Sequence, residues 1–393
     1  MGVNIDSILF VSHEFGVGGA TRSLISLIKG INYIFPEIQC QVLVPLKHGK
    51  KNKACDLFEQ NGVRYKNMLY RNDYKKVTDG YSFKYFIYDL INQFAVNKIG
   101  KYISKEHFSL ICSNSTAVSV GGAAAINKRI PHIQYIREMM EEDFQIEYRD
   151  KGLIKDIIEK SDGVVFNSGF VREKYIALYD IQSEVMFHVG INVQEFYYEK
   201  HDLFKKKNIN IIQIGTFKDG KGTKNSIEIM KRLRDHGADN FVMTFVGGGD
   251  NKYIDEMKSL ITKYELEQNI KIVDYTNCIN QYLNDADIFI MNSFSEGFGR
   301  VTVEAMAAGC LVLARNAGGT KEIVTDGNTG LLFNNEDEAA DKIVEVLAEK
   351  EKYIEVALRG QKYAMDNYGE IKTAKLFMDF CMSQLKNVNS SLE

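Results

Sequence analysis

The chain has 393 residues, of which 49 are Lys or Arg and 52 are Asp or Glu, giving a formal net charge of −3. That length suggests two domains of roughly 100–200 residues each. A hydrophobic share of 45% and a charged share of 26% are typical of a folded globular chain. The composition therefore excludes a disordered chain, and the balanced charge gives no reason to expect a nucleic-acid partner.

The cysteines and the apolar runs indicate a cytoplasmic protein. The six cysteines are widely spaced, with no C-x-x-C pair, and we interpret them as reduced core thiols rather than zinc ligands or disulfides. The N-terminal apolar run has no basic segment before it, and it is expected to be a strand rather than a signal peptide. The uncharged stretch 108–126 is broken by polar and Gly-Gly segments, which favours a buried strand–turn–helix over a membrane span.

Short apolar runs alternate with segments of helical periodicity along the whole chain. In the first half, strands are expected at 7–12, 41–46, 110–113, 132–137, 163–168 and 184–189. In the second half, they are expected at 209–215, 241–247, 270–275, 288–293 and 311–315. This alternation predicts parallel βαβ units, and the continuous β-branched runs suit sheets buried on both faces.

The polar segment 197–208 separates the two halves. We therefore expect one α/β domain over residues 1–200 and a second that begins at residue 201. Two doubly wound domains facing each other would form a cleft at the carboxyl ends of both sheets, where open α/β sheets bind ligands.

The first glycine loop follows the first expected strand. Gly16 and Gly18 fit the start of a dinucleotide fingerprint, but Thr21 stands where its third glycine belongs, and no acidic ribose ligand ends the second strand. This disfavours a nicotinamide site. The loop is interpreted either as a turn or as a place where the backbone at Gly18 and Gly19 approaches a phosphate or sugar.

The second glycine loop, 215–223, nearly matches a P-loop. Gly222 occupies the position of the magnesium-binding hydroxyl, which argues against a nucleoside triphosphatase. The loop still offers Lys218 and Lys221 after a strand, either as anion ligands or as solvated side chains.

The segment 292–309, NSFSEGFGRVTVEAMAAG, carries two carboxylates. Glu296 lies in a loop, and Glu304 lies one to two turns into a helix expected to begin near Gly299 or Arg300. The free N–H groups of that helix start form an anion site. Two carboxylates beside it make sense as acceptors from hydroxyls, so the segment suits a diphosphate with a hydroxylated ring on each side: a nucleotide sugar. Alternatively, Glu296 is a solvated loop residue and Glu304 a partner of the helix dipole.

The pattern E-G-F-G-x-x-x-x-E-A-M-A-x-G, followed by Gly318-Gly319-Thr320 and by D-G-N-T-G-L-L from Asp326, resembles the retaining glycosyltransferases of family 4. Glu296 and Glu304 match the E-x7-E signature of that family. The segment EGFGRVTVEAM is similar to the corresponding segment of bacterial enzymes that build surface polysaccharides. Weaker matches lie at Gly18-Gly19, 167–168, 190–192 and 215–222.

The resemblance implies the GT-B fold: α/β, with two Rossmann-like doubly wound domains facing an interdomain cleft. The N-terminal domain over 1–200 would serve the acceptor, and the domain over 201–370 would hold the nucleotide sugar. A helix over 371–393 would return to the N-terminal domain, with an apolar face of Leu376, Phe377, Phe380 and Leu385. No metal or other cofactor is implied, and a UDP-sugar is the favoured donor.

The resemblance also implies roles for single residues. Glu296 would hold the donor sugar and Lys221 would stabilise the leaving diphosphate, as the catalytic pair. The expected donor-binding residues are Gly18, Gly19, Lys218, Gly297, Phe298, Gly299, Arg300, Val301 and Glu304, with Glu304 reading the ribose. Thr216 replaces the family arginine of the basic loop, so the second charge at the diphosphate falls to Lys218 or Arg300.

The N-terminal domain departs from the family at Arg137-Glu138, where a His-Glu pair is common. Arg137, Glu138 and His132 are the acceptor-side candidates. The segment 64–105 holds nine Lys or Arg, three acids and seven tyrosines. It is interpreted either as a patch for peripheral contact with an anionic membrane or as a solvated insertion with buried aromatics.

The predicted activity is therefore retaining, metal-independent transfer of a sugar to a glycan, a lipid-linked acceptor or a protein. The main alternative is a non-catalytic GT-B subunit that binds acceptor and stabilises a partner transferase. Loss of either glutamate or of Lys221 would have favoured that alternative, and all three are present. An epimerase or phosphorylase on a similar fold is a third alternative.

Overall fold

The computed structural model describes residues 5–46, 52–140, 145–200 and 202–390. The chain divides into two compact units: Met1–Gly190 together with Glu370–Glu393, and Ile191–Gly369. The division falls just ahead of the polar segment that begins at Tyr197, and the last helix belongs to the first unit.

The N-terminal unit is built on a seven-stranded parallel sheet with the order β3-β2-β1-β5-β6-β8-β9. The strands are β1 (Ser7–Val11), β2 (Gln39–Pro45), β3 (Tyr65–Met68), β5 (Leu110–Ser113), β6 (His132–Ile136), β8 (Gly163–Phe166) and β9 (Glu184–Met186). The chain winds outward from β1 to β3, then returns to β5 and winds the other way. The point where the strand order reverses therefore lies between β1 and β5, where doubly wound sheets bind ligands.

Helices cover both faces of this sheet. Successive side chains of a strand point to opposite faces, so each strand contributes to two cores. Ile8 and Phe10 of β1 share a core with α1, α2 and α15, whereas Leu9 and Val11 share one with α3 and α4. The helices are α1 (Gly19–Ile34), α2 (Lys53–Gln60), α3 (Phe83–Glu106), α4 (Val120–Lys128), α6 (Lys151–Glu159), α7 (Gly169–Leu178) and α15 (Glu370–Ser390).

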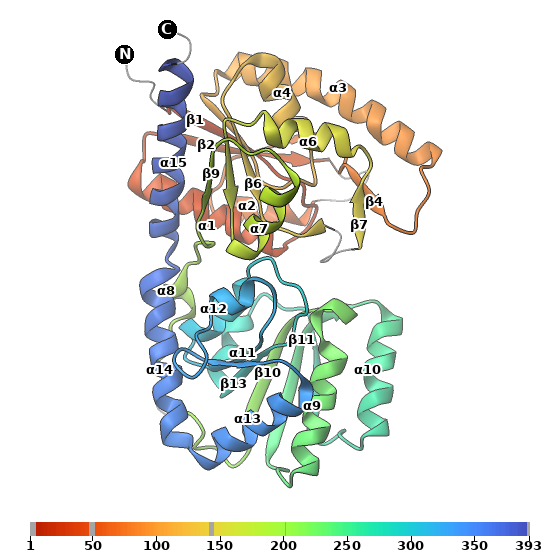
Figure 1. Ribbon diagram of the computed structural model, residues 1–393, viewed down its shortest axis with the longest axis vertical. Coiled ribbons are helices and arrows are strands. Elements are labelled where there is room, and N and C mark those ends of the chain that lie inside the picture. The colour runs from red at the N-terminus through yellow and green to blue at the C-terminus, as the bar shows by residue number, and fades with distance from the viewer. Residues whose placement is uncertain (1–4, 47–51, 141–144, 201, 391–393) are drawn as a thin grey trace. The chain divides into compact units, whose positions relative to one another are not determined.

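Helix α15 runs beside α1 within this unit (Figure 1). A Cβ atom on Gly30 of α1 would lie 2.6 Å from the carbonyl oxygen of Glu370, so the glycine allows the two helices to meet closely. The buried face of α15 consists of Ala374, Phe377, Met378, Cys381 and Leu385. Leu376, expected on that face, is exposed instead.

The second unit is built on a six-stranded parallel sheet with the order β12-β11-β10-β13-β14-β15. Its strands are β10 (Ile209–Phe217), β11 (Phe241–Gly249), β12 (Ile270–Asp274), β13 (Ile288–Met291), β14 (Leu311–Arg315) and β15 (Leu331–Phe333). Its strand order reverses between β10 and β13. The two sheets together are the α/β architecture expected from the sequence.

The helices of the second unit are α8 (Val193–Phe196), α9 (Thr223–Asp235), α10 (Asn251–Lys263), α11 (Ile279–Asp285), α12 (Arg300–Ala307), α13 (Glu336–Ala348) and α14 (Lys350–Asn367). Two 3₁₀ turns, η1 (Asp219–Lys221) and η2 (Gly318–Glu322), lie in loops at the carboxyl edge of the sheet. The main core joins the strands to α9, α10, α13 and α14.

Four strands were not expected from the sequence: β3, β15, and the antiparallel pair β4 (Tyr74–Lys76) and β7 (Ile146–Tyr148). Each has only three or four residues, and β3 and β4 are polar. Hydrophobic periodicity therefore gives little indication of them.

All six cysteines are free thiols. Five are buried as expected, whereas Cys278 is exposed, so the expectation of a core position is wrong for that residue. Across the described parts of the chain, no helix combines the length and the hydrophobicity needed to cross a membrane.

His132 lies at the first position of β6 and is buried. Its ring nitrogens lie 2.9 Å from the hydroxyls of Ser113 and Ser161. A Cβ atom on Gly122 of α4 would lie 2.8 Å from the ring, so the imidazole is packed tightly under that helix. Burial lowers the pKa of His132 from 6.5 to about 3, because no water remains to stabilise the charged imidazole.

We expect His132 to make the fold acid-sensitive. The unfolded chain takes up a proton near the usual histidine pKa and the folded chain does not, so stability is lost as the pH falls below 6.5 toward about 3. Between about pH 7.5 and about pH 5 this one group removes about 2 kcal/mol from the free energy of unfolding.

Urea unfolding of the wild type and of His132→Gln at both pH values measures the effect, since all other titrating groups are common to the two proteins. The variant should lose less stability on acidification. An equal loss in both proteins would contradict the assignment.

Candidate active site

Glu296 lies in the loop between β13 and α12, and glycines shape that loop. Gly299 adopts a left-handed conformation (φ 93°) directly before the helix begins at Arg300, as expected. A Cβ atom on Gly318 would lie 2.7 Å from the backbone nitrogen of Glu296, and the amide of Gly319 donates to the carbonyl oxygen of Glu296 at 2.7 Å. The segment at η2 therefore packs backbone to backbone against the Glu296 loop.

The structure brings the two catalytic candidates together. The ammonium group of Lys221, at the end of η1, forms a half-buried ion pair with the carboxylate of Glu296. Gly222 follows in a left-handed conformation (φ 62°), where a Cβ atom would collide with the backbone of Asn292. The Asn292 side chain donates to the carbonyl oxygen of Gly222 at 3.2 Å. The two loops are thus in direct contact.

Glu304 is the second carboxylate of the predicted pair. Its carboxylate is 3% exposed and accepts a hydrogen bond from Nε of Arg300, one helical turn earlier, at 2.7 Å. The structure thus pairs Glu304 with Arg300, a contact that was not predicted from the sequence. Since Arg300 is engaged by this carboxylate, it holds Glu304 in place.

Two buried hydroxyl groups without a partner in the described structure lie beside Gly299: that of Thr302 in the first turn of α12 and that of Thr320 in η2. A Cβ atom on Gly299 would lie 3.3 Å from Oγ1 of Thr302 and 3.1 Å from Oγ1 of Thr320. Buried hydroxyls are nearly always hydrogen-bonded in folded proteins. Two unpaired ones beside a helix N-terminus and a lysine form a site for an oxyanion.

The remaining donor-side candidates of this unit surround that site. Gly297 and Phe298 are buried, with the Phe298 ring 5.8 Å from the ring of Tyr368. Val301 is half-buried in the first turn of α12, and Lys218 is half-buried directly before η1. Lys218 lies on the loop that follows β10, and the others lie on the loop after β13 or at the start of α12, at the point where the strand order of the sheet reverses.

Arg315, at the end of β14, holds the loop that follows β13. Its guanidinium donates to the side-chain oxygen of Asn292 at 2.8 Å and pairs with Glu336 at 2.5 Å. Burial alone would raise the pKa of Glu336, but hydrogen bonds and the attraction to Arg315 together hold it below its usual value. Arg315, Asn292 and Thr302 were not predicted as site residues from the sequence. The sequence contains one signal for Arg315: it is a charged residue at the end of an otherwise apolar strand.

The first glycine loop, in the N-terminal unit, encloses a carboxylate. Oε2 of Glu14 accepts the backbone N–H of Thr21 at 2.6 Å and also its hydroxyl. A Cβ atom on Gly18 would collide with this carboxylate. In this structure the Glu14 carboxylate therefore lies at the N-terminus of α1, beside Gly18.

The acceptor-side candidates separate in the structure. Arg137 and Glu138 follow β6 at the carboxyl edge of the sheet, whereas His132 lies at the opposite end of that strand. Nε of Arg137 donates to Oδ1 of Asn114 at 3.0 Å, and Glu138 accepts from the hydroxyl of Ser115. Nη2 of Arg137 and the amide nitrogen of Asn114 are buried donors without a partner in the described structure. These two donors could receive an oxygen atom of a ligand.

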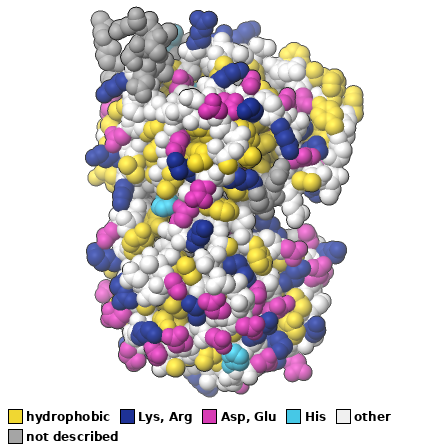
Figure 2. All heavy atoms as spheres, in the orientation of Figure 1, with side chains coloured by type: hydrophobic (Ala, Val, Ile, Leu, Met, Phe, Trp, Pro, Cys, Tyr) yellow, Lys and Arg dark blue, Asp and Glu magenta, His cyan; other side chains and the backbone are white. Residues whose placement is uncertain are grey.

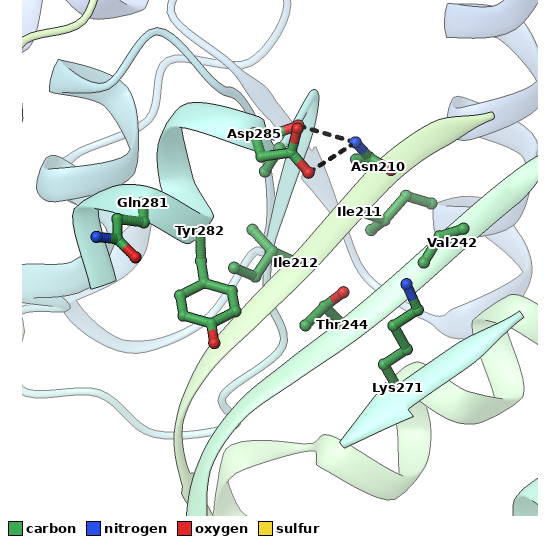
Figure 3. Close-up of a pocket in the computed structure, with 10 residues that line it drawn as sticks. Asn210, Ile211, Ile212, Val242, Thr244, Lys271, Gln281, Tyr282 and Asp285 are labelled. Atoms are coloured by element: carbon green, nitrogen blue, oxygen red, sulfur yellow. Dashed lines mark hydrogen bonds between the residues drawn. The ribbon is translucent and has the colours of Figure 1, made fainter. Parts of the chain in front are cut away.

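A separate pocket of about 280 Å³ lies at the other end of the second sheet (Figure 3). Lys271, Thr244 and Tyr282 line it, and the side chain of Asn210 donates to the Asp285 carboxylate at 3.1 Å. It contains none of the predicted site residues. Among the described residues, no group of three or more His, Cys, Asp or Glu side chains is placed to hold a metal ion.

Comparison with known proteins finds similarity to glycosyltransferases. Residues 193–363 match the family model of the glycosyl transferases group 1, and this region contains Lys221, Glu296 and Glu304. A GDP-Man:Man(3)GlcNAc(2)-PP-Dol alpha-1,2-mannosyltransferase of Dictyostelium discoideum is 31% identical over 163 residues. That alignment covers 39% of this chain and only 32% of the relative.

Two further relatives are similar over nearly the whole chain. An uncharacterized glycosyltransferase of Methanocaldococcus jannaschii is 26% identical over 88% of this chain and 90% of its own length. The crystal structure of HepE of Anabaena in complex with UDP and glucose has a TM-score of 0.78, with 20% identity over 96% of this chain and 99% of that one. The fold of the chain is therefore GT-B, and the family model and relatives together support a glycosyltransferase.

Proposed function

We propose that this protein is a retaining glycosyltransferase that moves a sugar from a UDP-sugar to a glycan, a lipid-linked acceptor or a protein. Its place would be the cytoplasmic side of the membrane, in bacterial cell-surface glycan synthesis. The observation that carries the proposal is the convergence of Lys221, Glu296 and the unpartnered hydroxyls of Thr302 and Thr320 at the start of α12.

The charges of this site suit a leaving diphosphate. The N–H groups of the first turn of α12 and the two threonine hydroxyls would hold the phosphate oxygens. An ammonium group has three N–H donors, so Lys221 can contact the diphosphate while it remains bonded to Glu296. Preorganised donors of this kind stabilise the charge that develops as the glycosidic bond breaks, without a metal ion.

The carboxylates would bind hydroxyl groups. Glu296 would hold the donor sugar and support the positive charge that develops at its anomeric carbon. Glu304, fixed by Arg300, would accept from the ribose. In the retaining step, the acceptor oxygen bonds to the anomeric carbon on the face that the diphosphate leaves, and the acceptor proton passes to the departing phosphate oxygen.

The identities of the nucleotide and of the acceptor are also part of the proposal. HepE, the structural neighbour, was solved with UDP and glucose, whereas the Dictyostelium relative is named for GDP-Man, so both nucleotides belong in a test. On the N-terminal unit, the buried and unpaired donor of Arg137 would receive an oxyanion of the acceptor.

Removing either member of the ion pair should abolish most of the activity. We expect Lys221→Ala and Glu296→Gln to release nucleotide from the preferred donor roughly 10²–10³-fold more slowly than the wild type, because a preorganised charge at the transition state is lost. The measurement is nucleotide release from a panel of UDP-, GDP- and dTDP-sugars. Lys271→Ala and Glu267→Gln, exposed residues of the same unit that lie outside the site, are the matched controls.

Wild-type rates in both site variants, with the controls equally active, would refute the assignment of Lys221 and Glu296. If the wild type bound acceptor but released nucleotide from no donor, the protein would instead be a non-catalytic subunit.

The threonine hydroxyls allow a test that separates binding from stability. Thr320→Val replaces an unpartnered buried hydroxyl by a methyl group, so the melting temperature should stay the same or rise. The affinity for UDP should fall about tenfold, because a hydrogen bond to a charged oxygen is lost. Calorimetric titration with UDP and thermal unfolding give the two values.

Thr329→Val is the matched control, since the Thr329 hydroxyl is buried but already accepts the backbone N–H of Thr325 at 2.9 Å. This control should lose stability and keep its affinity for UDP. Unchanged UDP affinity in Thr320→Val would remove Thr320 from the phosphate site.

A further inference from the structure

Helix α3 (Phe83–Glu106) has two apolar faces, and only one of them is buried. The inner face packs into the N-terminal unit through residues such as Ala95, Ile99 and Ile103. The outer face of its first half is exposed, with Phe83 at 76% and Phe94 at 75%. In Figure 1, α3 lies at the edge of this unit, and its N-terminal end reaches beyond the neighbouring helices.

The exposed side chains form a continuous stripe, which we call the α3 stripe: Phe83, Phe86, Ile87, Leu90 and Phe94. Their spacing of three or four residues places them on one side of the helix. Figure 2 shows hydrophobic side chains gathered over α3. Folded monomers rarely leave a large contiguous apolar surface in water, so a stripe of this kind marks a contact surface.

Lysines continue the same side of the helix. Lys98, Lys101 and Lys105 follow the stripe at helical spacing, and all three are exposed. The only acid among residues 83–105 is Asp89. Its carboxylate accepts a hydrogen bond from Nε of Arg149 at 2.9 Å, so it is engaged within the unit rather than balancing the lysines. The outer side of α3 is thus apolar at one end and positive at the other.

Polar contacts hold α3 in this orientation. The side chain of Asn92, on the inner face, donates to the buried carboxylate of Asp73 at 2.9 Å and accepts the backbone N–H of Arg71 at 2.8 Å. Arg149 pairs with both Asp73 and Asp89. The helix therefore cannot turn its stripe inward without breaking these buried contacts.

We propose that the outer side of α3 docks on an anionic lipid bilayer, with the α3 stripe in the interface and the lysines on the headgroups. A protein partner fits less well, since lysine is depleted in protein–protein interfaces. Aromatic and aliphatic side chains followed by lysines are the composition of helices that lie in a membrane interface. The contact itself does not depend on the proposed function, which it extends by presenting the enzyme to a lipid-linked acceptor.

Vesicle co-sedimentation tests the proposal. The wild type should bind vesicles of phosphatidylcholine mixed with phosphatidylglycerol, and raised salt should weaken the binding because it screens the lysines. Phe83→Gln/Phe94→Gln should lower the affinity at least about tenfold, since two exposed rings no longer enter the interface. Tyr33→Gln is the matched control, because Tyr33 is 75% exposed on α1 of the same unit.

A charge-reversal pair tests the lysines separately. Lys98→Glu/Lys101→Glu should lose the preference for the mixed vesicles over phosphatidylcholine alone. Lys53→Glu/Lys375→Glu, exposed lysines of α2 and α15 in the same unit, should keep it. Because all four lysines are exposed, these variants are expected to fold.

The proposal is overturned if the wild type does not bind the mixed vesicles, or if the Phe83/Phe94 variant binds them as well as Tyr33→Gln. It is also overturned if, without vesicles, the stripe holds a dimer that the Phe83/Phe94 variant dissociates. Nucleotide release with a soluble acceptor is measured in parallel. Its absence in a wild type that binds vesicles refutes the proposed function and leaves the membrane contact standing.

Discussion

Close backbone packing at the carboxyl edge of the second sheet is the constraint on which the candidate site depends. Gly222 lies against the backbone of Asn292, and Gly318 lies against that of Glu296, so that no side chain fits at either glycine. Because the loops touch directly, Lys221 and Glu296 come within ion-pair distance although they are 75 residues apart. The glycines of this region therefore allow the close backbone contacts that bring the charged side chains together.

The sequence predicted the scaffold because its signals are local. Eleven apolar runs were expected as strands, and each is a strand of one of the two sheets. The start of α12 at Arg300 was also predicted, since Gly299 and the following pattern mark a helix N-terminus. Within the site, residue type and position after strands drew attention to Glu296 and Lys221, and the family resemblance implied their roles. The structure places the two side chains in contact.

Other features depend on contacts that periodicity does not encode. The unpaired hydroxyl of Thr302 becomes informative only when its neighbours are known, and Arg315 reaches Asn292 from another strand. His132 was a candidate for the histidine that the resembled family commonly has on the acceptor side, yet its position at the amino end of β6 gives it a buried structural environment. The strands β4 and β7 pair across a long stretch of chain, and neither is apolar enough to be recognised alone.

The place of α15 has a consequence for the order in which the protein folds on the ribosome. Phe377 and Cys381 of this last helix are part of the core that holds α1 and the first strands. The N-terminal unit is therefore incomplete until α15 has been synthesised, whereas the unit Ile191–Gly369 is continuous and can fold earlier. A premature stop just ahead of Glu370 would damage the unit whose strands are made first.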